Sequence, residues 1–101
     1  MILYNVTVTI DPQVEAEWIE WMKNVHIPEV MKTGCFKEHR FLRLVTERPD
    51  VDGNTYAIQY FATDGKQIDI YMEKHAHGLR QTHAEKYGNK MAAFRTLLEE
   101  V

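Results

Sequence analysis

The alternation of apolar and polar residues at the start of the chain predicts a β-strand. Every second residue from Ile2 to Ile10 is apolar, and the other parity holds Leu3, Asn5, Thr7 and Thr9. A period of two with many β-branched residues is typical of a strand. Comparable runs predict strands over residues 36–47, 55–63 and 90–99.

Helical spacing predicts two long helices between these strands, over residues 12–25 and 66–86. The first has an apolar stripe at spacings of three and four, made of Val14, Trp18, Trp21 and Val25 and widened by Met22. Ile27 precedes Pro28 and is expected to leave the α conformation, so a separate short helix is predicted over residues 28–32. One face of the second long helix holds Ile68, Met72, His75, Leu79 and His83.

The order βα(α)ββαβ is typical of a ferredoxin-like α+β fold. We expect a single domain over residues 1–101 with a four-stranded antiparallel sheet. Right-handed crossovers place both long helices on one face of that sheet.

The other face of the sheet is also apolar, although no helix remains to cover it. The second parity of the first strand carries no charge, and both parities of the last strand are apolar: Met91, Ala93 and Leu97 on one, Ala92, Phe94 and Leu98 on the other. An apolar face of this size usually marks an interface. We therefore predict a homodimer, with two sheets packed face to face into a dimeric α+β barrel.

Composition limits the other partners. The 101 residues hold 12 Lys+Arg against 15 Asp+Glu, with a formal net charge of −3. This dispersed charge does not form the basic stripe that binds nucleic acid, and no apolar run is long enough to span a membrane.

Cys35 is the one cysteine and fits a small buried hydrophobe. The first apolar run is a strand rather than a signal peptide, so we expect a cytoplasmic protein.

His26 is the candidate catalytic residue. It lies at the end of the first long helix, before the break at Ile27 and Pro28. The helix dipole favours the charged imidazolium there, and a histidine is suited to acid–base work near neutral pH. The alternative is that His26 only caps the last helical carbonyls.

Asn5, Arg43, Gln59 and Arg95 are the candidate ligand-binding residues. Each interrupts an otherwise apolar or β-branched strand. If they face one space, their amide and guanidinium groups would suit a small anion such as a carboxylate. The alternative is a hydrogen-bond network at the interface with Glu38, Glu47 or Glu99.

No metal or cofactor is expected. His75 and His77 point to different sides of their helix, and His75 lies two turns from His83, so the three do not converge on one ion. Neither a glycine-rich dinucleotide loop nor a phosphate-binding loop is present.

Four segments resemble a family of short bacterial proteins of unknown function. They are MILYNVTV at residues 1–8, WMKNVHIPEVMKTGCF at 21–36, YAIQYF at 56–61 and AFRTLL at 93–98. That family is similar to the dimeric α+β barrel superfamily. The resemblance implies a ligand cleft between sheet and helices, with a histidine near a His-x-Pro bend such as His26–Pro28.

Haem-degrading members of that superfamily use an asparagine, a tryptophan and a histidine. Asn5 and His75 resemble two of these. Trp18 and Trp21 both lie on the first helix, so the tryptophan of the haem-degrading pattern has no match in this sequence. The spacing of the tryptophans is that of core packing.

Two functional hypotheses follow. The first is a homodimeric small-molecule-binding or structural domain with no demonstrable reaction. The second is a cofactor-independent enzyme, monooxygenase- or isomerase-like, acting on a small aromatic or anionic metabolite. In that enzyme His26 would transfer protons, while Arg43, Gln59 and Asn5 would orient the substrate.

Overall fold

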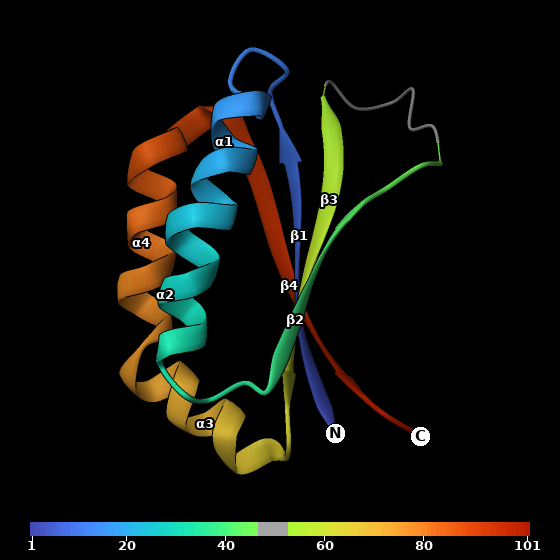
Figure 1. Cartoon of the computed structure of the whole chain (residues 1–101), viewed down its shortest axis with the longest axis vertical. Helices are drawn as coiled ribbons and strands as arrows, with labels where there is room; N and C mark the ends of the chain where they lie inside the picture. The colour runs from blue at the N-terminus through green and yellow to red at the C-terminus, as the bar shows by residue number, and fades with distance from the viewer. Residues whose placement is uncertain (47–52) are drawn as a thin grey trace.

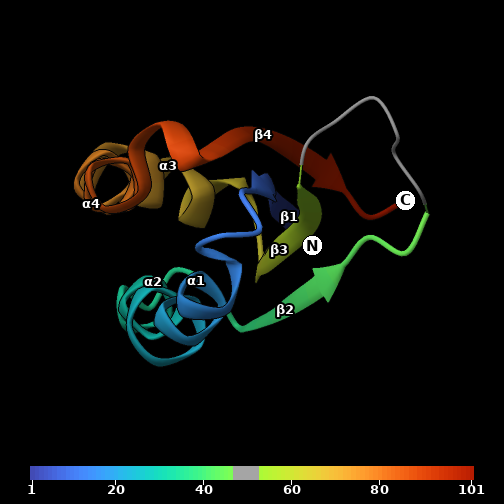
Figure 2. The same cartoon turned by 90° about the horizontal axis from the view of Figure 1, so that it is seen from above.

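A layer of helices covers one face of a twisted sheet in the computed structural model (Figures 1 and 2), which describes residues 1–46 and 53–101. In chain order the elements are β1 (Ile2–Ile10), α1 (Glu15–Trp21), the π-helical turn η1 (Met22–His26), α2 (Ile27–Lys32), β2 (Glu38–Arg43), β3 (Asn54–Ala62), α3 (Gly65–Lys74), α4 (Ala76–Tyr87), the 3₁₀ turn η2 (Gly88–Lys90) and β4 (Met91–Glu99). None of the helices in these ranges is long and apolar enough to cross a membrane.

The sheet confirms the predicted α+β ferredoxin-like fold. Its strand order is β2-β3-β1-β4, and all neighbouring strands run antiparallel. Alternation along β1 and β3 separates the two faces, as the period-two pattern predicts. Tyr4, Val6, Val8 and Ile10 of β1 are buried beneath the helices, where Trp18 is fully buried with them.

The second face of the sheet has no helix over it (Figure 2). Leu3, Phe61 and Leu98 lie opposite one another in register on this face. Phe94, on the same face, is 60% exposed and Leu98 is 46% exposed. This single chain therefore presents the apolar face that the sequence predicts.

Strand β2 is shorter than the predicted strand over residues 36–47. Phe36 leaves the ladder and packs into the core, where its ring lies 5.2 Å from that of Tyr60 and 4.9 Å from that of Tyr71. The far end of the predicted strand, residue 47, and most of the predicted turn at 49–54 lie outside the described residues.

The predicted break before Pro28 does not occur. Ile27 is helical, with φ −60° and ψ −45°, and α1, η1 and α2 form one continuous helix (Figure 1). Pro28 therefore lies inside this continuous helix, directly after the π-helical turn, and supplies no backbone N–H to it.

The helix predicted over residues 66–86 is divided at His75, whose φ of −127° and ψ of −36° separate α3 from α4. The break changes the helical phase. Ala76, His83 and Tyr87 are buried as a result, whereas His75 and Leu79 are only half-buried.

Candidate functional site

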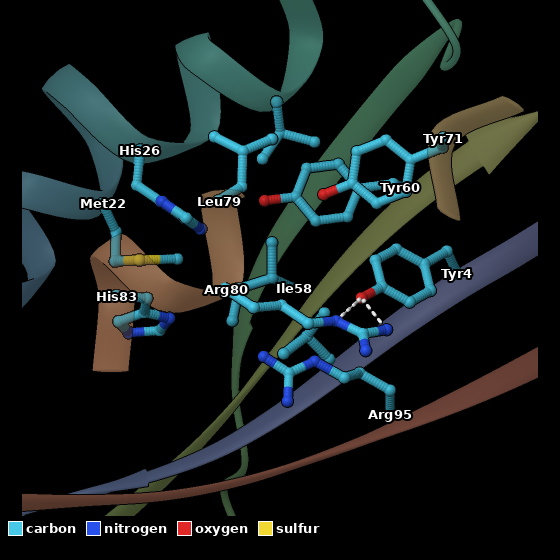
Figure 3. A pocket seen from close by; sticks show the side chains of 12 residues that line it. Tyr4, Met22, His26, Ile58, Tyr60, Tyr71, Leu79, Arg80, His83 and Arg95 are labelled. Carbon is cyan, nitrogen blue, oxygen red and sulfur yellow. Dashed lines mark hydrogen bonds between the residues drawn. The ribbon is translucent and has the colours of Figure 1, made fainter. Parts of the chain in front are cut away.

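A small cavity lies between the helix layer and the covered face of the sheet (Figure 3). Its volume is about 20 Å³, which is room for about one water molecule. The lining combines apolar, aromatic and basic side chains, namely Tyr4, Val6, Met22, His26, Val30, Ile58, Tyr60, Tyr71, Leu79, Arg80, His83 and Arg95.

The π-helical turn η1 places His26 in this cavity. The N–H of Ile27 donates to the carbonyl oxygen of Met22, a five-residue hydrogen bond that accommodates one extra residue in the turn. Met22 and His26 consequently both face inward, and Val25, predicted to be part of the apolar stripe, is 40% exposed instead. The helix does not end at His26 and the side chain makes no capping hydrogen bond, so the capping interpretation is wrong.

His26 lies within an aromatic cluster. Its ring stacks on Trp21 at 4.9 Å and lies 5.0 Å from the ring of His83. Nδ1 of His26 is buried without a hydrogen-bond partner in the described residues. Burial, aided by the positive charge of Arg95, lowers the pKa of His26 to about 4. The imidazole is therefore neutral near pH 7, and the expectation that a helix dipole holds it charged is wrong.

His83 is held from the other side by Trp18. The indole Nε1–H donates to Nε2 of His83 at 2.9 Å. An indole nitrogen can only donate, so neutral His83 carries its proton on Nδ1. Burial, together with the charges of His26 and Arg95, lowers the pKa of His83 to about 3.

Two arginines reach the cavity from opposite layers, Arg80 from α4 and Arg95 from β4 (Figure 3). Arg80 donates from Nη2 to the hydroxyl oxygen of Tyr4 at 3.0 Å and from Nε at 3.3 Å. Nε of Arg95 is buried and has no partner among the described residues. In the part of the chain that the structure describes, no Asp or Glu lines the cavity.

Tyrosine hydroxyls complete the polar lining. Burial raises the pKa of Tyr60, and the neighbouring Tyr71 and Tyr4 raise it further. The pKa of Tyr71 is also raised, mainly by burial. Both phenols stay protonated at physiological pH and can donate hydrogen bonds.

The sheet separates the four predicted ligand-binding residues. Asn5 and Gln59 are directly opposed in register, but on the open face. Arg95 pairs in register with Val6 on the covered face. Arg43, on the edge strand β2, donates from Nε to the hydroxyl of Tyr56 at 3.1 Å. Strand parity therefore excludes a common site for all four, and only Arg95 lines the cavity with His26.

The sequence analysis does not identify Arg80, Tyr4, Tyr60 or Tyr71 as lining residues, and it places His83 only as a semi-buried residue on one face of its helix. A usable signal was present in α4, where Ala76, Arg80, His83 and Tyr87 recur at spacings of three and four. An arginine on the inward stripe of a helix is unusual unless it meets a partner. In residues 1–46 and 53–101, no three His, Cys, Asp or Glu side chains form a group that could hold a metal.

The sequence that builds this site matches a known protein family. The family model described as "Domain of unknown function (DUF4286)" matches residues 1–101. The chain belongs to the DUF4286 family. This match confirms the resemblance to a family of unknown function, and among curated proteins there is no significant match to this DUF4286 chain.

Solved structures similar to the DUF4286 chain share its fold. An ethyl tert-butyl ether D (EthD) family protein from Bacillus halodurans C-125 has a TM-score of 0.72 and 17% identity, with 100% of each chain covered. HapK from Hahella chejuensis has a TM-score of 0.71 and 12% identity, with 100% of this chain and 93% of HapK covered. A dimeric ferredoxin-like protein from an uncultured marine organism has a TM-score of 0.60 and 10% identity, with 99% and 98% covered.

Proposed function

We propose that this protein is a homodimeric domain that binds a small molecule in the cavity between its helices and its sheet. The observation that carries the proposal is the lining itself. Buried polar atoms normally have partners, yet Nδ1 of His26 and Nε of Arg95, both from residues that line this cavity, have none in the described part of the chain. A bound ligand would supply those partners.

Access to the cavity would depend on Leu79. This half-buried side chain lines both the cavity and a surface groove of about 490 Å³ that also includes residues of α2 and α4. Leu79 therefore separates the two spaces. A change of its rotamer would join them and make room for a ligand larger than one water molecule.

The homodimer is supported by the open face of the sheet. Phe94 and Leu98 are exposed there, and a fold neighbour is itself described as dimeric. On that face Asn5 donates to Thr7 at 3.1 Å, while its Oδ1 is buried without a partner in the described residues. We assign Asn5 and Gln59 to the dimer interface rather than to the ligand. The predicted cytoplasmic location stays a prediction.

A second candidate function is that of a cofactor-independent enzyme of the monooxygenase or isomerase type. The observation that favours it is His26, whose neutral imidazole lines the cavity and whose Nδ1 has no partner among residues 1–46 and 53–101. A neutral imidazole can accept a proton from a bound substrate. In that enzyme Arg95 would hold the substrate, and Asn5, Gln59 and Arg43 would not contact it.

Native mass spectrometry of gently purified protein tests the ligand site. We expect a mass near twice 11.9 kDa with a discrete small adduct. Leu79→Phe adds bulk at the cavity wall and should remove the adduct. Val25→Phe adds the same kind of bulk at an exposed position and is the matched control. An adduct that survives in Leu79→Phe would show that the ligand binds elsewhere.

A further inference from the structure

We infer that the cavity binds a small organic monocarboxylate, whose carboxylate is held between Arg95 and Arg80 and whose apolar body packs against the aliphatic lining. This inference rests on the proposed function, because it names the chemical class of the ligand of that same cavity. It follows from the charges of the lining, from the geometry of the two arginines and from the composition of the remaining wall.

The lining has a surplus of positive charge. Arg80 and Arg95 both carry a positive charge, and no Asp or Glu of residues 1–46 and 53–101 is among the lining residues. The described ion pairs include neither arginine. Charges removed from water are costly unless they are paired. A bound anion would balance this surplus, whereas a cation or a metal ion would be repelled by it.

Arg95 is aimed at the interior. It pairs in register with Val6, whose side chain lies on the covered face. Arg95 lines the same cavity as His26 and His83, and its positive charge contributes to the lowered pKa of both histidines. Its buried Nε has no acceptor in the described residues, which leaves that donor free for an oxygen of the ligand.

Arg80 supplies the second guanidinium. Its hydrogen-bond acceptors are the hydroxyl oxygen of Tyr4 and the sulfur of Met72, and both are neutral. These bonds orient Arg80 without balancing its charge. Because the Tyr4 oxygen accepts from Arg80, its own proton is available for a further acceptor. Planar guanidinium groups match the two oxygens of a carboxylate in geometry as well as in charge.

The rest of the wall favours an organic anion over an inorganic one. Helices and the sheet contribute aliphatic and thioether groups to the lining. These groups belong to Met22, Val30, Ile58 and Leu79. A phosphate ion would place polar oxygens against these groups without hydrogen bonds. A carboxylate with an apolar body satisfies both parts of the lining.

Isothermal titration calorimetry with benzoate tests this inference, with benzamide as the neutral analogue of the same shape. We expect benzoate to bind and benzamide to bind at least tenfold more weakly. Arg95→Met should weaken benzoate roughly ten- to hundredfold, the usual effect of losing a hydrogen bond between charged groups. The matched control is Lys37→Gln, which removes one positive charge from an exposed position outside the cavity and should leave the affinity unchanged.

Thermal melting shows whether the variant folds. Arg95→Met replaces a charge without a partner by an apolar side chain of similar length, so we expect its melting temperature without ligand to be equal to or above that of the parent protein. A folded Arg95→Met protein that binds benzoate as tightly as the parent would overturn the inference. Arg80→Met is a second variant for the same comparison.

Other outcomes separate this inference from the proposed function. Equal binding of benzoate and benzamide, both abolished by Leu79→Phe, would refute the carboxylate while retaining the ligand site. Inorganic phosphate that binds as tightly as benzoate would refute the apolar body. If benzoate does not bind at all, the inference fails, and the adduct in native mass spectrometry still decides the proposed function.

Discussion

His26 and His83 show how burial sets the chemistry of single residues in this protein. Both imidazoles line a cavity that two guanidinium groups also line, with no carboxylate from residues 1–46 and 53–101. Neither ring has an acid nearby to stabilise its charged form, so both stay neutral in the folded protein at neutral pH. This neutrality makes the stability of the fold sensitive to acid.

We predict that the protein loses stability as the pH falls from about 6.5 towards 4. The pKa of His26 drops from 6.5 to about 4 on folding, and the pKa of His83 drops to about 3. The unfolded chain therefore takes up protons first, and protonation favours unfolding. Each histidine contributes a slope of up to about 1.4 kcal/mol per pH unit in this window.

Urea unfolding at several pH values between 7 and 4 measures that slope. His26→Gln should reduce the slope, and His77→Gln, at an exposed position of α4, should not change it. A parent protein equally stable at pH 7 and pH 4.5 would show that the two histidines are not buried as described.

At the same scale, the sequence identified His26 and Arg95 but missed Arg80. An arginine that interrupts an apolar strand is conspicuous, because period two leaves few alternatives for its orientation. An arginine on a helix is conspicuous only if the inward stripe is known, and the break at His75 shifts that stripe. A correct phase for α4 would have placed Arg80 beside His83.

At the scale of elements, the π-helical turn could not be predicted from the pattern of apolar residues. The order of strands and helices follows from apolar periodicity, which is why the ferredoxin-like topology could be predicted. A π-helical turn leaves the helical periodicity of the segments before and after it unchanged, and it inserts one extra residue between those two segments. In a single sequence that residue is indistinguishable from an ordinary helical position, so Val25 was placed inward and His26 at a helix end.

Two glycines give a matched test of backbone constraints in these elements. Gly53, before β3, has a φ of +114°, and a Cβ there would clash with the carbonyl oxygen of Ile10. Gly78, in α4, has open space around it and no positive φ. We predict that Gly53→Ala destabilises the protein by about 1 kcal/mol or more.

Gly78→Ala should instead stabilise it by roughly 0.5–1 kcal/mol, the difference in helix propensity. Chemical denaturation of the two variants and the parent measures both effects. A shift in the same direction for both variants would contradict the structural distinction between these positions.

At the scale of the whole molecule, the uncovered face of the sheet is an apolar surface that the single chain leaves exposed. Its central strands β1 and β3 contribute Leu3 and Phe61, and its edge strand β4 contributes Phe94 and Leu98. An apolar face of this kind is stable in water when another surface covers it. The sequence predicts this surface because alternation along a strand is enough to assign its side chains to the two faces of the sheet. That assignment does not depend on the phase of any helix.

We predict that Phe94→Asp converts the protein from a dimer to a monomer. An Asp side chain at this position would place a charge in the proposed interface without a partner. Val25→Asp introduces the same charge at an exposed position of the helix layer and should leave the dimer intact. Sedimentation velocity distinguishes the two results, and a Phe94→Asp protein that remains dimeric would place the interface elsewhere.

The aromatic cluster beside the cavity also makes the protein its own optical reporter. The chain has two tryptophans, and each contacts a cavity histidine, Trp21 by stacking on His26 and Trp18 by its hydrogen bond to His83. Indole emission responds to the charge and polarity of its immediate surroundings. Intrinsic fluorescence should therefore register the arrival of an anion or a proton in the cavity, so that unlabelled protein can be screened against small molecules in ordinary buffer.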